Sequence, residues 1–160
     1  MTRPLRIAQV APPSERVPPL AYGGTERIVH GLVVELVDRG HQVTTFASGD
    51  SDVPGELVAT VPEALRPAGY VGDPLPWFHV TMQQVVDRAA DFDIIHSHLE
   101  WASLLLARVS PTPVVATFHG RLDLPWAETL LRDAPRGLVA ISHNQAATHP
   151  EVAWEAVVHN

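Results

Sequence analysis

The sequence predicts a three-layer α/β sandwich built on a mainly parallel sheet, and two observations carry this prediction. A strand, a helix and a second strand follow one another at the start of the chain, as in a βαβ unit. Apolar runs then recur, and each is followed by a short polar tip and a helix. Strands that are apolar throughout are buried on both faces, which requires helices on each side of a parallel sheet. The predicted fold is therefore Rossmann-like.

The first βαβ unit is the most clearly patterned part of the chain. Strands are expected over residues 5–10 and 42–47, on either side of a helix that follows Gly24. Apolar residues of that helix fall on one stripe, namely Ile28, Val29, Leu32, Val33, Leu36 and Val37. Thr25 is expected to be its N-cap, and Glu26 is expected to lie off the stripe. Gly40 follows the last turn, where a left-handed C-cap is predicted.

The remaining elements are predicted from apolar runs and from helical periods. Further strands are expected over residues 57–61, 92–98, 113–118, 137–141 and 155–159, and further helices over residues 77–90, 100–109, 125–133 and 145–148. The helix over residues 77–90 is expected to bury Phe78, Met82, Val85 and Val86. Residues 62–76 are rich in proline and glycine and are expected to form a loop.

Polar groups follow the carboxyl ends of the predicted strands. They are the Gly23–Gly24 pair, the histidines His96 and His98, then His119 and Ser142. Ligands of parallel α/β sheets bind outside the carboxyl ends of the strands, where the strand order reverses. These residues are therefore expected to meet at one edge of the domain.

The Gly23–Gly24 pair lies between a proline-rich loop and the start of a helix. Glycines let backbone N–H groups approach a ligand closely, and a helix N-terminus adds partial positive charge. This combination fits an anionic or hydroxyl-rich ligand. The other interpretation is a turn that simply needs glycine dihedral angles.

Composition excludes several classes of protein. The chain has 160 residues, the size of one domain, and a net charge of −7, which argues against nucleic acid or an anionic membrane as the main partner. It contains no cysteine, so disulfides and thiolate metal sites are excluded. No apolar run approaches the length of a transmembrane segment, and the expected compartment is the cytoplasm.

Dinucleotide and P-loop chemistry are also disfavoured. The first strand is not followed by a Gly-x-Gly-x-x-Gly fingerprint, no acidic residue ends the second strand, and the chain has no Gly-Lys-Ser/Thr triplet. Ser142 is not framed as a nucleophile elbow, so it is expected to cap the helix after it.

His96 and His98 could contribute two ligands to a zinc site, because residues i and i+2 of a strand point to the same side. Glu100 follows them, but a further ligand would have to come from His119 or His143, and no spacing enforces this. No metal is therefore expected. The alternative has one of the two strand histidines packed beneath the sheet edge and the other facing solvent.

His119 ends the most apolar predicted strand, and Gly120 after it leaves room beside the imidazole. A histidine in that position can hydrogen-bond a hydroxyl or a phosphate of a ligand. The alternative is an edge histidine whose partners are all within the protein. The four tryptophans could stack on a sugar or a base, but each is more often a packing residue.

Seven segments carry short motifs along the chain, including Gly-Gly-Thr-Glu, Gly-His-x-Val, Asp-x-x-His and Thr-x-His-Gly. They lie at residues 6–10, 23–26, 36–43, 92–98, 114–120, 139–142 and 157–160. In this order they resemble the N-terminal domain of the family-4 retaining glycosyltransferases of the GT-B fold, which use sugar nucleotides. The resemblance covers essentially the whole chain. It implies that residues 1–160 form one Rossmann-like domain, which is the acceptor-side half of a GT-B fold.

The resemblance also implies a division of labour between two domains. Family enzymes hold most of the sugar nucleotide in a C-terminal domain, which would begin after Asn160 and is absent from these residues. The partners would be a small-molecule sugar acceptor, a nucleotide-sugar donor and that missing domain. Whether the chain alone is an enzyme is uncertain, and the isolated chain is expected to transfer no sugar. No cofactor is implied, since the sugar nucleotide is a co-substrate.

The resemblance also implies roles for eight residues of this chain. His119 is the expected catalytic residue, near the donor sugar and the acceptor. The residues expected to bind the donor diphosphate or the acceptor are Tyr22, Gly23, Gly24, Thr25, His98, Gly120 and Ser142. The alternative function is a stand-alone Rossmann-like module that binds a carbohydrate or a protein.

Overall fold

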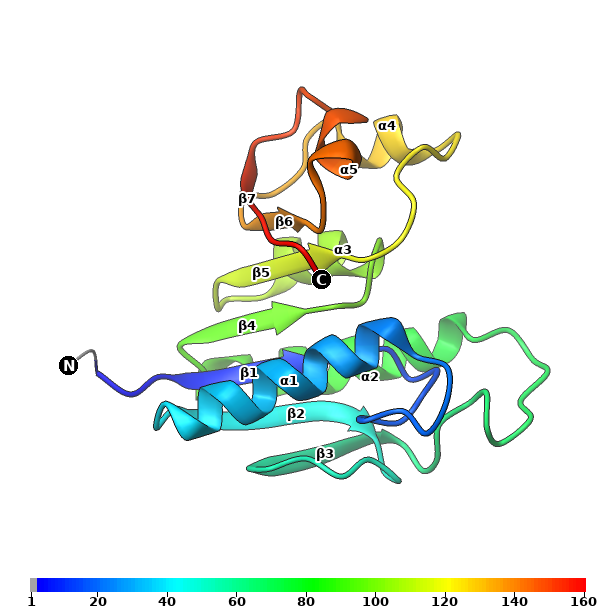
Figure 1. The fold of residues 1–160 in the computed structure, drawn as a ribbon, viewed down its shortest axis with the longest axis vertical. Coiled ribbons are helices and arrows are strands. Elements are labelled where there is room, and N and C mark those ends of the chain that lie inside the picture. The colour runs from blue at the N-terminus through cyan, green and yellow to red at the C-terminus, as the bar shows by residue number, and fades with distance from the viewer. Residues whose placement is uncertain (1–2) are drawn as a thin grey trace.

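The computed structural model describes residues 3–160, which form a seven-stranded sheet in which every pair of neighbouring strands is parallel (Figure 1). The strands are β1 (Arg6–Val10), β2 (Gln42–Ser48), β3 (Glu56–Val61), β4 (Ile94–Ser97), β5 (Val114–Phe118), β6 (Leu138–Ala140) and β7 (Trp154–Val157). Their spatial order is β3-β2-β1-β4-β5-β6-β7. Each strand expected from the sequence is present, and its ends lie within a few residues of the expected positions.

The helices are α1 (Gly24–Asp38), α2 (Leu75–Asp87), α3 (Ala102–Val109), α4 (Ala127–Leu131) and α5 (His143–Ala147), with a 3-10 turn, η1 (Ala89–Asp91), after α2. Helix α1 covers one face of the sheet, and α2 and α3 lie on the other (Figure 1). The predicted three-layer sandwich is therefore confirmed. Within residues 3–160, no helix is both long enough and apolar enough to cross a membrane.

Strand β2 shows how the sheet separates two cores. Val43 and Ala47 pack with Val29 of α1 on one face. Phe46 points to the opposite face and packs with Met82 of α2. Successive side chains of a strand alternate between faces, so an apolar run without interruption supplies both cores at once.

Helix α1 ends in the predicted glycine cap. Gly40 has φ +85°, its N–H donates to the Val37 carbonyl at 2.8 Å, and the His41 N–H donates to the Leu36 carbonyl at 3.0 Å. These two bonds form a Schellman motif, which satisfies carbonyls that the helix would leave free.

The start of α1 differs from the prediction, because Thr25 is not the N-cap. Gly23 takes that position with φ +135°, and its carbonyl accepts the Arg27 N–H at 3.2 Å. A Cβ added at Gly23 would lie 2.7 Å from the Cβ of Pro19, so the proline-rich loop leaves space for glycine only. The N-cap therefore lies two residues earlier than expected, and no side chain caps the helix.

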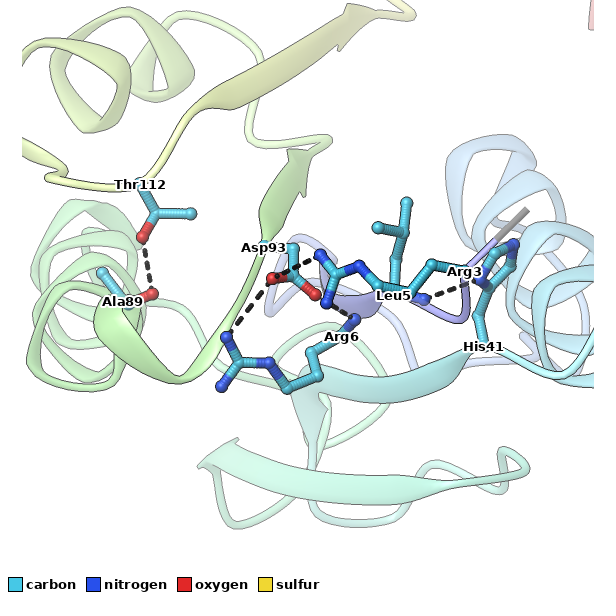
Figure 2. A network of polar contacts seen from close by, with 7 residues as sticks. All are labelled: Arg3, Leu5, Arg6, His41, Ala89, Asp93 and Thr112. Carbon is cyan, nitrogen blue, oxygen red and sulfur yellow. Dashed lines mark hydrogen bonds and ion pairs between the residues drawn. The ribbon is translucent and has the colours of Figure 1, made fainter.

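The amino ends of the strands are joined by a polar network around Asp93 (Figure 2). Asp93 Oδ2 accepts the backbone N–H of Arg6 at 2.8 Å, and Oδ1 lies 3.3 Å from the guanidinium groups of Arg3 and of Arg6. The backbone hydrogen bond and these cations hold the pKa of Asp93 down at about 2. Asp93, which belongs to the Asp-x-x-His motif, therefore has a structural role at the edge away from the strand carboxyl ends.

Gly137 gives a stability prediction with an internal control. It has φ +86°, and an added Cβ would lie 2.5 Å from the Val114 carbonyl oxygen, so Gly137→Ala should lower the free energy of unfolding by roughly 1–3 kcal/mol. Gly31 lies within α1 with nothing within 4 Å of an added Cβ. Gly31→Ala should therefore raise the free energy of unfolding by roughly 0.5–1 kcal/mol. Urea unfolding of both variants tests this, and equal midpoints would contradict it.

Candidate functional site

The strand order reverses beside β1, which has β2 on one side and β4 on the other. A cavity of about 480 Å³ lies at this point, which we call the switch-point cavity. Its walls include Pro12 and Ser14 after β1, Leu99 and Glu100 after β4, and the first turn of α1. This is the position where parallel α/β sheets bind ligands, because loops diverge there and leave a crevice.

Three of the residues expected to bind ligand line the switch-point cavity, namely Tyr22, Gly24 and Thr25. Gly24 is exposed, whereas Gly23 is buried behind it. Trp101 also lines the cavity, while its ring packs edge-on against Phe118 at 5.4 Å between centroids. One tryptophan of the four is thus placed where an aromatic face could meet a ligand.

Three carboxylates line the switch-point cavity, namely Asp73, Glu26 and Glu100, and the last two have raised pKa values. Glu26 was expected to lie off the apolar stripe of α1, and this was wrong, because Glu26 is only 5% exposed and shares the buried side of the helix with Val29 and Val33. Glu100 follows β4 with φ +52°, an uncommon conformation for a residue with a side chain. Burial raises the pKa of Glu26 and also that of Glu100.

His119, Gly120 and Ser142 line a second cavity of about 450 Å³. Glu100 connects it to the switch-point cavity, since Glu100 Oε1 accepts the backbone N–H of His119 at 2.9 Å. The predicted meeting of these groups with the start of α1 at one sheet edge is therefore observed. They occupy two linked cavities there, and His98 borders a third.

Ser142 caps α5, as predicted. Its Oγ accepts the Gln145 N–H at 3.0 Å. Gln145 in turn donates through Nε2 to the carbonyls of Phe118 at 3.1 Å and Gly120 at 2.7 Å. The loop that follows β5, and with it His119, is thus held by the start of α5.

His119 is also held by a buried histidine. His119 Nε2 lies 2.9 Å from Nδ1 of His98, and His98 is fully buried. On the same side of the sheet, the rings of His96 and His98 lie side by side with centroids 4.2 Å apart. His98 is fully buried, whereas His96 is partly exposed and lines the third cavity.

Burial makes all three imidazoles hard to protonate. It lowers the pKa of His96 and that of His119 to about 4, with a smaller contribution to the His96 pKa from the charge of His119, and it lowers the pKa of His98 well below its usual range. Their nitrogens are engaged in hydrogen bonds within the protein. Among residues 3–160, no three potential ligands of the histidine, cysteine and carboxylate types are grouped closely enough to hold a metal ion.

Sequence reasoning missed the structural roles of Gln9 and Gln145. Gln9 lies within β1, is 1% exposed, and contacts both His96 and His98. A single glutamine among the apolar residues Ile7, Ala8 and Val10 was the available signal, because a buried amide needs partners nearby. No comparable signal marked Gln145, whose partners come from loops distant in the sequence.

The fold and its edge define a class of protein: a Rossmann-like domain with a ligand crevice at the switch point, bordered by a helix start and a buried imidazole cluster. The family model described as Glycosyltransferase Family 4 matches residues 22–151. The chain belongs to this glycosyltransferase family.

A solved structure supports the same assignment. The chain is similar to AviGT4, a glycosyltransferase involved in Avilamycin A biosynthesis, with a TM-score of 0.57 and 25% sequence identity. The match covers 97% of this chain and 41% of the AviGT4 chain, so the chain spans about two fifths of that protein's length. No curated protein sequence matches the chain significantly.

Proposed function

We propose that the chain is the acceptor-side domain of a retaining, sugar-nucleotide-dependent glycosyltransferase of the GT-B type. The observation that carries the proposal is the switch-point cavity, which has the start of α1 on one side and Glu100, bonded to the His119 backbone, on the other. Family membership supports it. A second, donor-binding domain would supply the opposite wall of the reaction cleft.

Each site residue receives a role under this proposal. Gly24, at the positive end of α1 and with Gly23 buried behind it, presents the helix start to the donor diphosphate. His119 contacts the transferred sugar and the acceptor. Tyr22 and Thr25 line the acceptor side of the cavity. Gly120 and Ser142 border the second cavity, and His98 supports His119 from behind.

The charges of the switch-point cavity favour an acceptor without negative charge. Glu26, Glu100 and Asp73 line it, and its one lining arginine, Arg66, is paired at 2.7 Å with Glu15. Carboxylates in a partly desolvated cavity repel a phosphate or carboxylate group more strongly than they would in water. The proposed acceptor is therefore a neutral or cationic hydroxylated molecule.

No metal or cofactor is part of the proposed mechanism, and the proposed compartment is the cytoplasm. The bond between sugar and nucleotide could be broken with the help of the positive ends of helix dipoles and of hydrogen-bond donors from the second domain. The chain itself contributes hydrogen-bonding groups and the acceptor cavity.

The test compares the isolated chain with the chain joined to a family-4 C-terminal domain. We expect no transfer from UDP- or GDP-sugars by the isolated chain and measurable transfer by the two-domain protein, with neutral acceptors preferred over phosphorylated analogues. Product formation is followed by mass spectrometry. Turnover of a nucleotide sugar by the isolated chain would contradict the proposal.

The alternative function is a stand-alone binding module. A third cavity of about 420 Å³ favours it, because α1 residues Ile28 and Leu32 and the C-terminal Val158 give that cavity a mainly apolar lining. A tight homodimer in sedimentation experiments, with no response to an added C-terminal domain, would support this alternative over glycosyl transfer.

A further inference from the structure

Six polar side chains near the carboxyl ends of β1, β4 and β5 form one continuous chain of contacts. It runs from Asn160 Nδ2 to His119 Nδ1 (3.1 Å), from His119 Nε2 to His98 Nδ1 (2.9 Å), from His98 Nε2 to Gln9 Oε1 (3.1 Å), from Gln9 Nε2 to His96 Nδ1 (3.4 Å), and from His96 Nε2 to Thr117 Oγ1 (2.8 Å). Each imidazole uses both of its nitrogens within this chain.

The amide of Gln9 sets the direction of these hydrogen bonds. An amide oxygen only accepts and an amide nitrogen only donates, whereas a neutral imidazole has one donor and one acceptor. Gln9 Oε1 therefore requires a proton on Nε2 of His98, and Gln9 Nε2 requires an unprotonated Nδ1 on His96. His96 then carries its proton on Nε2 and donates it to Thr117.

The same constraint passes along the chain to His119. With its proton on Nε2, His98 has an unprotonated Nδ1, which can only accept, so His119 must donate from Nε2. Nδ1 of His119 is then an acceptor, and it takes the amide N–H of Asn160. With the amide oxygens and nitrogens of Gln9 and Asn160 placed as in this structure, one arrangement of hydrogens satisfies all five contacts, and the three histidines share the same neutral tautomer.

We propose that Gln9 and His98 are positioning residues that hold His119 as the Nε2–H tautomer, so that His119 presents Nδ1 to a ligand as a hydrogen-bond acceptor. The position taken by the Asn160 amide is then the position of a ligand hydroxyl or N–H group. A phosphate or carboxylate oxygen, which can only accept, does not fit there. The identity of the ligand as a sugar rests on the proposed function, whereas the tautomer does not.

Burial makes this arrangement costly to disturb. Gln9 and His98 are 1% and 0% exposed, so an unpaired polar atom on either would remain without water. A proton added to Nδ1 of His98 would face the Nε2–H of His119. The lowered pKa values of the three imidazoles agree with the neutral state that the chain requires.

The tautomers can be measured in the 160-residue chain itself. Long-range ¹H–¹⁵N correlation spectra of the ¹⁵N-labelled protein at pH 7.5 distinguish Nε2–H from Nδ1–H imidazoles. We expect His96, His98 and His119 to be Nε2–H, with the exposed His79, which lies outside this chain of contacts, as a reference signal. An Nδ1–H form of His98 or His119, or opposite tautomers in those two neighbours, would overturn the proposal.

Two substitutions of Gln9 separate positioning from packing. In Gln9→Glu both carboxylate oxygens accept, so His98 and His119 should keep Nε2–H while His96 gains a proton on Nδ1. In Gln9→Leu, His98 loses its acceptor, and the single tautomer of His98 and His119 should be replaced by a mixture. His79→Gln is the matched control and should leave all three spectra unchanged.

The proposed tautomers can be tested even if Gln9→Leu is too unstable to fold. Backbone amide spectra show whether Gln9→Leu folds, and if it does not, the wild-type and Gln9→Glu spectra still decide. Unchanged His98 and His119 tautomers in a folded Gln9→Leu protein would refute the role of Gln9. No donor or acceptor sugar is needed, so correct tautomers in a chain whose two-domain form transfers no sugar would refute only the proposed function.

Discussion

Replacing His119 with alanine is expected to lower kcat/KM for sugar transfer by roughly 100-fold or more in a two-domain enzyme that contains this chain. The imidazole is held from behind by His98 at 2.9 Å and through its backbone by Glu100 at 2.9 Å, so its position is set before a ligand arrives. A preorganised hydrogen-bonding group is effective because little reorganisation accompanies the reaction. Alanine would remove the only imidazole that borders the second cavity.

The measurement is steady-state kinetics with a saturating donor, together with thermal unfolding to show that the variant is folded. His79→Ala is the matched control, because His79 is exposed on α2 and touches neither cavity. It should retain wild-type kcat/KM. An unchanged rate for His119→Ala would remove His119 from the reaction and leave a purely structural role.

Acidification from about pH 6.5 to pH 5 is expected to destabilise the fold. Burial lowers the pKa values of His96 and His119 to about 4, and it lowers the pKa of His98 well below its usual range. In this interval the unfolded chain, with histidine pKa values near 6.5, binds protons that the folded chain does not bind. If one to three more protons bind to the unfolded state, the free energy of unfolding falls by roughly 1.4–4 kcal/mol per pH unit.

Some groups act in the opposite direction. Burial works against protonation of His149, but hydrogen bonds to the Leu122 carbonyl and to Glu151 raise its pKa. His149 therefore stabilises the folded state more as the pH falls. The raised pKa values of Glu26 and Glu100 likewise favour the folded state at acidic pH. The free energy of unfolding should still decrease as the pH falls, because the histidines of the unfolded chain bind protons at a higher pH than its carboxylates do.

Urea unfolding at pH 7.5, 6.5, 5.5 and 5.0 measures this slope. His79→Gln should show the same pH dependence as the wild type, since His79 is exposed. A free energy of unfolding that stays constant or rises between pH 6.5 and pH 5 would contradict the neutral, buried state of the histidine cluster. It would also weaken the argument that His119 acts as a neutral hydrogen-bonding group.

The histidine cluster and the switch-point cavity are built by the same two strands, β1 and β4. Strand β1 supplies Gln9 to the cluster and, immediately after its last residue, Pro12 and Ser14 to the cavity. Strand β4 supplies His98 and then Glu100 in the same way. Parallel pairing in register brings these segments together, because neighbouring strands end at the same sheet edge.

The sequence alone determined the layered fold, most element positions and two helix caps. Continuous apolar strands, the period of α1, Gly40 after its last turn and Ser142 before α5 are local signals, and local geometry decides them. It also determined that polar groups after several strands would share an edge, since a parallel sheet leaves no other arrangement.

Only the tertiary structure decided which of those groups touch and which are buried. Glu26 is buried at the start of α1, and the N-cap is Gly23 rather than Thr25, in a left-handed conformation packed against Pro19. The chain of contacts from Gln9 to His119 joins residues distant in sequence, and the direction of its hydrogen bonds follows from their packing. Desolvation and hydrogen-bond partners are set by these long-range contacts, which no local pattern of residues records.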